Sequence, residues 1–206
     1  MRRLALRISS AIMLLLALPL AAQNDIPGAE VVHPYQRLTV PNLAVVTATD
    51  TSSPAVAKAA LAIVLSGSKV KCGPDSQLES AVEANAGSPL RTLASKISGA
   101  SCATNGRTLH VTAAFTPNAA IQGDSLIASV IEGKPLLVEW KGALYVLYGV
   151  VYDEHLFPSG RHDNVIRKLL LIDPRYPDKR RFVAFEREKD NFGQLEGVAS
   201  VGVTER

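Results

Sequence analysis

The strongest pattern in the first half of the chain is a block of small and apolar residues that runs from Pro54 to Ser66. Ser53 stands where a side chain can cap the first turn of a helix, and Gly67 stands where helices commonly end. The block is apolar almost all round, which is typical of a helix that is buried on every side. We therefore expect residues 54–66 to form the central helix of the core.

Three more segments carry helix start and stop signals. The first two have one apolar and one polar face, so we expect them to pack on the outside of the domain. Residues 24–50, which precede the central helix, contain spaced prolines and are expected to be extended and irregular. The further helices are predicted over residues 74–86, closed by Gly87; over residues 89–98, capped by Ser88; and over residues 125–132, capped by Asp124.

The second half of the chain shows strand periodicity, after one earlier alternating segment at residues 107–115. The turns between these segments are too short for helical crossovers, so the strands are expected to pair antiparallel. This order predicts an α+β fold in which an N-terminal helical half, with a buried central helix, packs on one face of a C-terminal antiparallel sheet. The later strands are predicted over residues 136–140, 143–152, 165–172, 181–187 and 195–203.

The first 23 residues have the three regions of a secretory signal peptide. Three arginines precede an apolar run over residues 11–20, and residues 21–23 form a small-residue cleavage zone. The apolar run is shorter than the roughly 20 residues that a membrane-spanning helix needs. We expect cleavage after Ala22 or Gln23, export to the periplasm or the medium, and no attachment to the membrane.

Charge argues against nucleic acid as a partner of the exported chain. The formal net charge of +3 comes from 22 basic and 19 acidic residues, and the signal peptide holds three of the arginines. Its removal leaves 19 basic against 19 acidic residues, so no broad positive surface is expected. The remaining length suits an extended segment over residues 24–50 followed by one domain over residues 51–206.

The chain has two cysteines, Cys72 and Cys102. Exported proteins meet an oxidising environment, where an even number of cysteines favours disulfide formation. We expect these two residues to form a bridge that stabilises the fold by about 3–4 kcal/mol. A free Cys72 that acts as a nucleophile is the competing interpretation.

Four strings occur in an order that a peptidase family also shows. Residues 56–65 read VAKAALAIVL, residues 133–140 read GKPLLVEW, residues 142–149 read GALYVLYG, and residues 171–174 read LIDP. Their order and spacing resemble those of papain-like cysteine peptidases of the bacterial kind, which include staphopain-like enzymes, effector proteases and bacteriocin-leader peptidases. The resemblance covers residues 36–190 and implies a papain-like α+β fold with a cleft that accepts extended peptides.

The catalytic residues of that family are missing in this register. Such peptidases need a thiolate, an imidazole that accepts its proton, and an acid or amide that orients the imidazole. Val56 stands at the cysteine and Ala143 at the histidine, while Asp50 lies near the expected oxyanion-hole glutamine. Only Asp173 matches, and an Asp-Pro turn at a strand end explains it. The resemblance therefore implies an exported pseudopeptidase without catalytic residues or cofactor, whose cleft binds a peptide or protein.

An active cysteine peptidase that uses Cys72 is the alternative. Residues 71–74 read KCGP, which resembles the D-C-G-P string at the nucleophile helix of leader-processing peptidases. A thiol at a helix N-terminus has a lowered pKa. The following helix is polar, however, and Ala143 still occupies the histidine position, so one of His110, His155 and His162 would have to replace it.

Carboxylates and imidazoles also gather over residues 153–163, between two predicted strands. Groups of this kind bind zinc or calcium when their spacing brings them together. The spacing here follows no known ligand pattern, so we expect a polar hairpin tip and no metal. The residues concerned are Asp153, Glu154, His155, His162 and Asp163.

Overall fold

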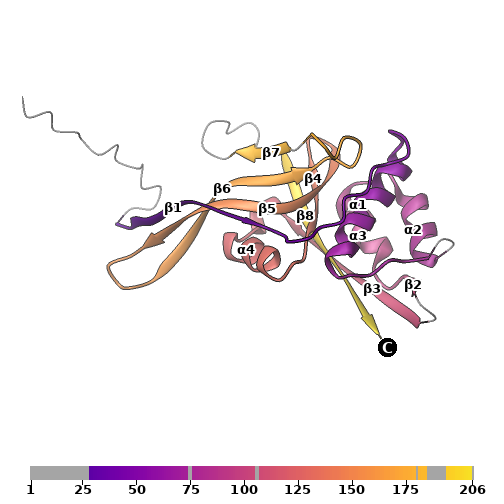
Figure 1. The fold of residues 1–206 in the computed structure, drawn as a ribbon, viewed down its shortest axis with the longest axis horizontal. Helices are drawn as coiled ribbons and strands as arrows, with labels where there is room; N and C mark the ends of the chain where they lie inside the picture. The colour runs from indigo at the N-terminus through magenta and orange to yellow at the C-terminus, as the bar shows by residue number, and fades with distance from the viewer. Residues whose placement is uncertain (1–27, 74–75, 105–106, 180, 185–193, 206) are drawn as a thin grey trace, which may run out of the picture.

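The computed structural model describes residues 28–73, 76–104, 107–179, 181–184 and 194–205 of this chain. The predicted signal peptide lies outside the described residues. Within them, eight strands and four α-helices are found (Figure 1). Their bounds in chain order are β1 (Glu30–Thr39), α1 (Ser53–Gly67), α2 (Gln77–Asn85), α3 (Leu90–Ile97), β2 (Ser101–Thr104), β3 (Arg107–Pro117), the 3-10 helix η1 (Asn118–Ala120), α4 (Gly123–Ile131), β4 (Leu136–Trp140), β5 (Ala143–Leu156), β6 (His162–Ile172), β7 (Arg181–Ala184) and β8 (Leu195–Glu205).

All eight strands belong to one antiparallel sheet. Seven follow one another in the order β2-β3-β8-β4-β5-β6-β7, and β1 pairs with β5 off this path. The first part of β5 pairs with β4, from Ala143 to Leu147, and its second part pairs with β1, from Gly149 to Leu156. The second half of β5 and the first half of β6 therefore form an arm of the sheet, and β1 pairs with β5 along this arm (Figure 1).

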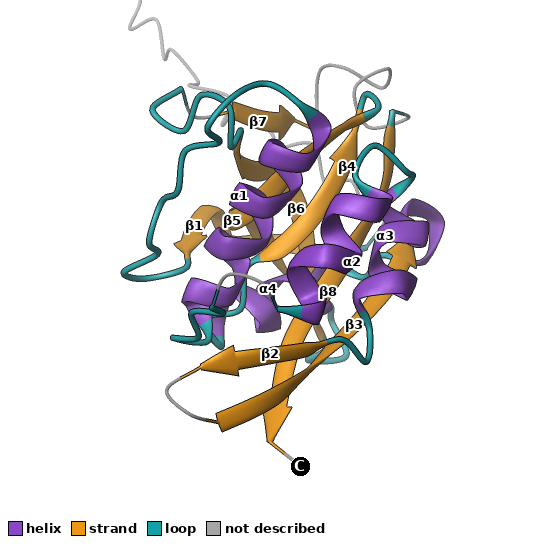
Figure 2. Cartoon of the chain, turned by 90° about the vertical axis from the view of Figure 1, so that its right-hand side faces the viewer, coloured by secondary structure: helices purple, strands orange, loops and turns teal. Residues whose placement is uncertain are grey.

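Helices cover both faces of this sheet. The first three helices pack on one face, and α4 packs on the other (Figure 2). Strand β4 shows the division, because Leu137 belongs to the core under α1, α2 and α3, whereas Leu136 and Val138 belong to the core under α4. Val146 and Leu147 of β5 divide in the same way. Central strands with two buried faces read as continuous apolar runs.

The papain-like α+β arrangement expected from the sequence, a helical N-terminal half on one face of a C-terminal sheet, is wrong. The structure is mostly antiparallel sheet, with 41% strand against 28% helix. Strands β1, β2 and β3 come from the first part of the chain and join the same sheet, and α4 covers its opposite face. The apolar strands need cover on both faces, so one helical layer does not suffice.

Helix α1 is nevertheless the central core helix, as predicted. Ser52, one residue earlier than expected, is its N-cap and accepts a hydrogen bond from the N–H of Ala55, and Pro54 occupies the first turn. Its own residues Ile63 and Val64 are almost completely buried. None of the helices in the described part of the chain is long and apolar enough to cross a membrane.

Other local expectations need smaller corrections. Ser88 and Asp124 do not cap α3 and α4, which have Pro89 and Gln122 at those positions without side-chain capping bonds. The segment expected to be irregular contains β1, whose backbone is broken by register shifts around Pro34 and Tyr35. The short strand β2 was not predicted, and part of the strand expected over 181–187 lies outside the described residues.

Candidate functional site

A pocket of about 150 Å³ lies where the start of α1, the start of α3 and the β4–β5 hairpin meet. Its wall combines hydroxyl-bearing, apolar and charged side chains. The pocket thus lies at the junction of the helical layer and the sheet. The residues that line it are Thr51, Ser53, Val56, Ala57, Gly87, Ser88, Leu90, Leu93, Glu139, Gly142, Ala143, Leu144 and Arg175.

Two residues of the pocket wall are those that the family resemblance assigns to catalysis. Val56, in the first turn of α1, and Ala143, the first residue of β5, are 87 positions apart in sequence and line the same pocket. Both side chains are hydrocarbons that carry no proton, charge or lone pair. The pocket therefore holds neither a thiol nor an imidazole at these positions, and papain-type acyl transfer has no nucleophile here.

The β4–β5 hairpin fixes the position of Ala143. Trp140 and Ala143 are paired across it, so the turn consists of Lys141 and Gly142 alone. Both turn residues have positive φ, 54° and 66°, as a type I′ turn requires. The N–H of Lys141 also donates to the carbonyl of Gln194, which ties the turn to the start of β8.

Arg175 brings a positive charge to the pocket, and Asp173 holds it in place. The buried Asp173 carboxylate accepts hydrogen bonds from Nε and Nη2 of Arg175 at 2.8 and 2.9 Å, and one from its backbone N–H at 3.0 Å. Arg175 also lies over the ring of Tyr145. Asp173 therefore orients a guanidinium toward the pocket, a role that needs no histidine.

Glu139 brings a negative charge to the same pocket. Its Oε2 accepts the N–H of Leu90 at the start of α3, at 2.8 Å. Burial raises the pKa of the Glu139 carboxyl, and the neighbouring carboxylate of Glu196 raises it further, against the opposing effect of the Leu90 N–H. The pocket thus carries a fixed cation and a carboxylate that is easier to protonate than usual.

Asp50 does not line this pocket, although it stands near the oxyanion-hole position of the resemblance. Its Oδ1 accepts the backbone N–H of Ser52 at 2.7 Å, and hydrogen bonds from Ser52 lower the pKa of its carboxyl. Asp50 therefore shapes the turn that leads into α1. The neighbouring Thr51 lines the pocket instead.

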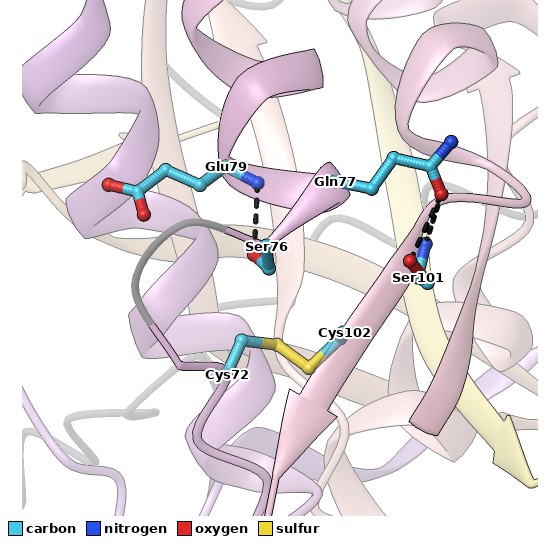
Figure 3. Close-up of a disulfide and its surroundings, with 6 residues drawn as sticks. All are labelled: Cys72, Ser76, Gln77, Glu79, Ser101 and Cys102. Carbon is cyan, nitrogen blue, oxygen red and sulfur yellow. Dashed lines mark hydrogen bonds between the residues drawn. A yellow bond between two sulfur atoms is a disulfide. The ribbon is translucent and has the colours of Figure 1, made fainter. Parts of the chain in front are cut away.

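The predicted disulfide between Cys72 and Cys102 is confirmed (Figure 3). The bridge joins the segment after α1 to strand β2, with the two Cα atoms 5.3 Å apart. Next to it, Ser76 caps α2 through the N–H of Glu79, as Figure 3 also shows. Both cysteines of the chain are used in the bridge, so Cys72 offers no thiolate.

The cluster over residues 153–163 separates into two faces of the β5–β6 arm. Glu154 accepts hydrogen bonds from the exposed rings of His33 and His162, which lower its pKa. Asp163 pairs with Arg161 at the hairpin tip. No group of three or more histidine, cysteine or acidic side chains in the described parts of the chain is placed to hold a metal.

The other face of the arm buries the remaining polar residues. Asp153 is 3% exposed and Arg167 is 6% exposed, and they form an ion pair at 2.7 Å. His155 is fully buried, and its two ring nitrogens have no hydrogen-bond partner among the described residues. His110 lies on β3, paired with Ser101 and Thr204, and lines neither this cluster nor the pocket.

Sequence reasoning missed Arg175 and Glu139, the two charged residues of the pocket. Glu139 had a detectable signal, because a carboxylate within the otherwise apolar strand at 136–140 needs a partner or a function. Arg175 follows the Asp-Pro pair directly, but only the folded chain turns its side chain back toward the pocket.

Comparison with protein-family models and with curated proteins gives no relative from which a function can be transferred. No protein-family model matches the chain, and no curated protein matches its sequence.

Proposed function

We propose that this protein is an exported, non-catalytic binding protein whose pocket at Val56 and Ala143 takes the end of a peptide. The observation that carries this function is the pocket itself, in which two hydrocarbon side chains stand where the resemblance expects a thiol and an imidazole, beside an ordered guanidinium. The pocket can then hold a peptide without the thiol and imidazole that would cleave it.

Arg175 gives the pocket its chemical preference. Its Nε and Nη2 atoms are engaged by Asp173, and its Nη1 amino group has no hydrogen-bond partner among the described residues. A carboxylate is the natural acceptor for a guanidinium that is already oriented. A pocket of about 150 Å³ takes one small group, so a peptide's C-terminal carboxylate fits better than a long side chain.

Export rests on the N-terminal pattern and on the disulfide. Residues 1–23 have the order of charges and apolar residues that secretory signals have. Disulfides persist outside the reducing cytosol and are rare within it. The alternative of a Cys72 peptidase is disfavoured, because the thiol it needs is consumed by the bridge.

Peptides with a free C-terminal carboxylate should bind the exported, disulfide-bonded protein without being cleaved. We expect peptides with an amidated C-terminus to bind about 10- to 100-fold more weakly, because a charge-assisted hydrogen bond is lost. Arg175→Lys should give a similar loss of affinity. Lysine keeps the positive charge opposite Asp173 but lacks the planar guanidinium that can bind Asp173 and a ligand carboxylate at once. Fluorescence anisotropy with labelled peptides measures the affinities, and mass spectrometry measures cleavage.

Arg161→Lys, at the exposed hairpin tip, is the matched control and should leave binding unchanged. An epoxide probe for cysteine peptidases should not label the protein. Labelling of a cysteine, together with peptide cleavage that Cys72→Ala abolishes, would show an active peptidase. Equal affinity for free and amidated peptides would remove Arg175 from the binding function.

Affinity for the free carboxylate should rise as the pH falls. Above its raised pKa, Glu139 is ionised and repels an anionic ligand in the same pocket. As the pH falls through that pKa, Glu139 becomes neutral, while a peptide C-terminus stays ionised down to about pH 3.5. Peptide affinity measured between pH 7 and pH 4 tests this, and Glu139→Gln should abolish the pH dependence. If affinity still rises toward low pH in this variant, a group other than Glu139 is responsible.

A further inference from the structure

A second and larger hollow lies on the outer side of the helical layer, between α1, α2 and the segment 69–73. Its volume is about 590 Å³, and it shares no lining residue with the pocket at Val56. Its apolar lining comes from Leu61, Ala62, Leu65, Val70, Leu78 and Val82. We call this hollow the α1–α2 groove.

The groove interrupts the otherwise close packing of α1. Leu61 and Leu65 are buried, but Ala62 between them is exposed. On the segment before α1, Val46 also lines the groove and is 37% exposed. A groove of a few hundred Å³ with an apolar floor and a few polar groups at its rim has the form of a small-molecule site.

Charge is distributed unevenly around the groove. At one end Lys58 forms ion pairs with Glu79, at 2.7 Å, and with Glu83, so this end is compensated. At the other end Lys69 and Lys71 are exposed, and neither forms an ion pair within the described part of the chain. Two lysines that have no ion-pair partner among the described residues, beside an apolar floor, complement an anion that carries an apolar body.

We propose that the α1–α2 groove binds a single-chain amphiphile with a carboxylate head group. The alkyl chain lies along Leu61, Leu65 and Val82, and the carboxylate lies at Lys69 and Lys71. An amphipathic helix is roughly 10 Å across, so two turns of it exceed the volume of the groove, whereas one alkyl chain does not. This site is independent of the peptide function, because the two hollows share no residue.

A series of saturated fatty carboxylates with 8 to 16 carbons tests the groove. Each ligand is titrated below its micelle concentration into the disulfide-bonded protein, in a calorimeter. Affinity should rise about fourfold per added methylene until the groove is filled, and then level off. The alcohol of the same chain length should bind more weakly, by up to about fivefold for each lysine contact that is lost.

Ala62→Trp should fill the groove and remove binding, since Ala62 is exposed and its replacement leaves the core untouched. Ala128→Trp, at an exposed position of α4 on the opposite face, is the matched control and should bind normally. Lys69→Gln with Lys71→Gln should reduce the preference for the acid over the alcohol. Peptide binding at Arg175 should be unchanged in all these variants, which separates the two sites.

Three outcomes would overturn the assignment. Affinity that does not depend on chain length, or that persists in Ala62→Trp, places the amphiphile elsewhere on the protein. Binding of an acidic helical peptide that Ala62→Trp abolishes, with no binding of any carboxylate in the series, identifies the groove as a protein-docking surface instead.

Discussion

Removal of the Cys72–Cys102 bridge should lower the free energy of unfolding by about 3–4 kcal/mol. The bridge closes a loop of 30 residues, and without it the unfolded chain regains the conformational entropy of that loop. The loop contains α2 and α3, and the bridge fixes the start of this loop to β2 at the edge of the sheet. Urea unfolding of the oxidised protein and of a Cys72→Ser, Cys102→Ala double variant measures the difference; alanine is chosen because Cys102 is fully buried.

Reduction supplies the control for this measurement. A reducing agent should destabilise the wild-type protein by a similar amount and should leave the double variant unchanged. A loss below about 1 kcal/mol in the double variant would mean that the unfolded chain is already compact around this loop. Alkylation of a cysteine in the folded, unreduced protein would contradict the bridge itself.

Turn chemistry explains why some elements were predicted accurately. The bounds of β4, residues 136–140, agree between prediction and structure. Gly133 and Pro135 end the preceding segment, and Lys141-Gly142 makes the two-residue turn that follows. Such residues restrict the backbone locally, so they can be recognised without knowledge of the rest of the fold.

The prediction missed the second helical layer because it placed helices on only one face of the sheet, whereas the central strands are buried on both faces. The run Leu136-Leu137-Val138 is continuously apolar, and neighbouring residues of a strand point to opposite faces. An exposed outer face would have required polar residues at alternate positions. The run therefore indicated that the far face of the sheet is covered, and the structure shows that α4 is the helix that covers it.

The candidate site divides in the same way between local and long-range information. The family resemblance selected Val56 and Ala143, and the fold brings both to one pocket. Arg175 and Glu139 reach the pocket through hydrogen bonds to Asp173 and to the N–H of Leu90, which no local pattern reveals. The apolar strand around Glu139 marks this carboxylate as unusual in the sequence, but the place where it and Arg175 meet follows only from the fold.

The group at residues 153–163, expected to form a polar hairpin tip, was only partly placed correctly, because Asp153 and His155 are buried in strand β5. Asp153 and Glu154 are adjacent in sequence, but in a strand they point to opposite faces of the sheet. Glu154 lies at the surface between two histidines, whereas Asp153 lies inside with Arg167. Residues that are close in sequence here lie on opposite faces of the sheet, so sequence proximity alone did not show which of them are buried.

Asp153→Ala should destabilise the protein by about 3–5 kcal/mol. The carboxylate of Asp153 accepts a hydrogen bond from Nε of Arg167 at 2.7 Å, and one from the N–H of Tyr35 at 2.6 Å, where β1 departs from regular pairing. Its removal leaves a buried guanidinium without this carboxylate, which is the costly way to break a buried ion pair. Urea unfolding followed by circular dichroism measures the loss.

Two further variants distinguish the contribution of the Asp153–Arg167 ion pair to stability from the effect of changing any buried polar residue of the arm. Asp153→Ala combined with Arg167→Met should cost less than Asp153→Ala alone, because no charge is left inside. His155→Phe, two residues along the same face, should be neutral or stabilising, since both ring nitrogens of His155 are buried without a partner among the described residues. A loss in His155→Phe as large as that in Asp153→Ala would mean that His155 has a partner in solution. In that case the loss in Asp153→Ala would reflect disruption of the buried face of the arm in general, and not the ion pair with Arg167 in particular.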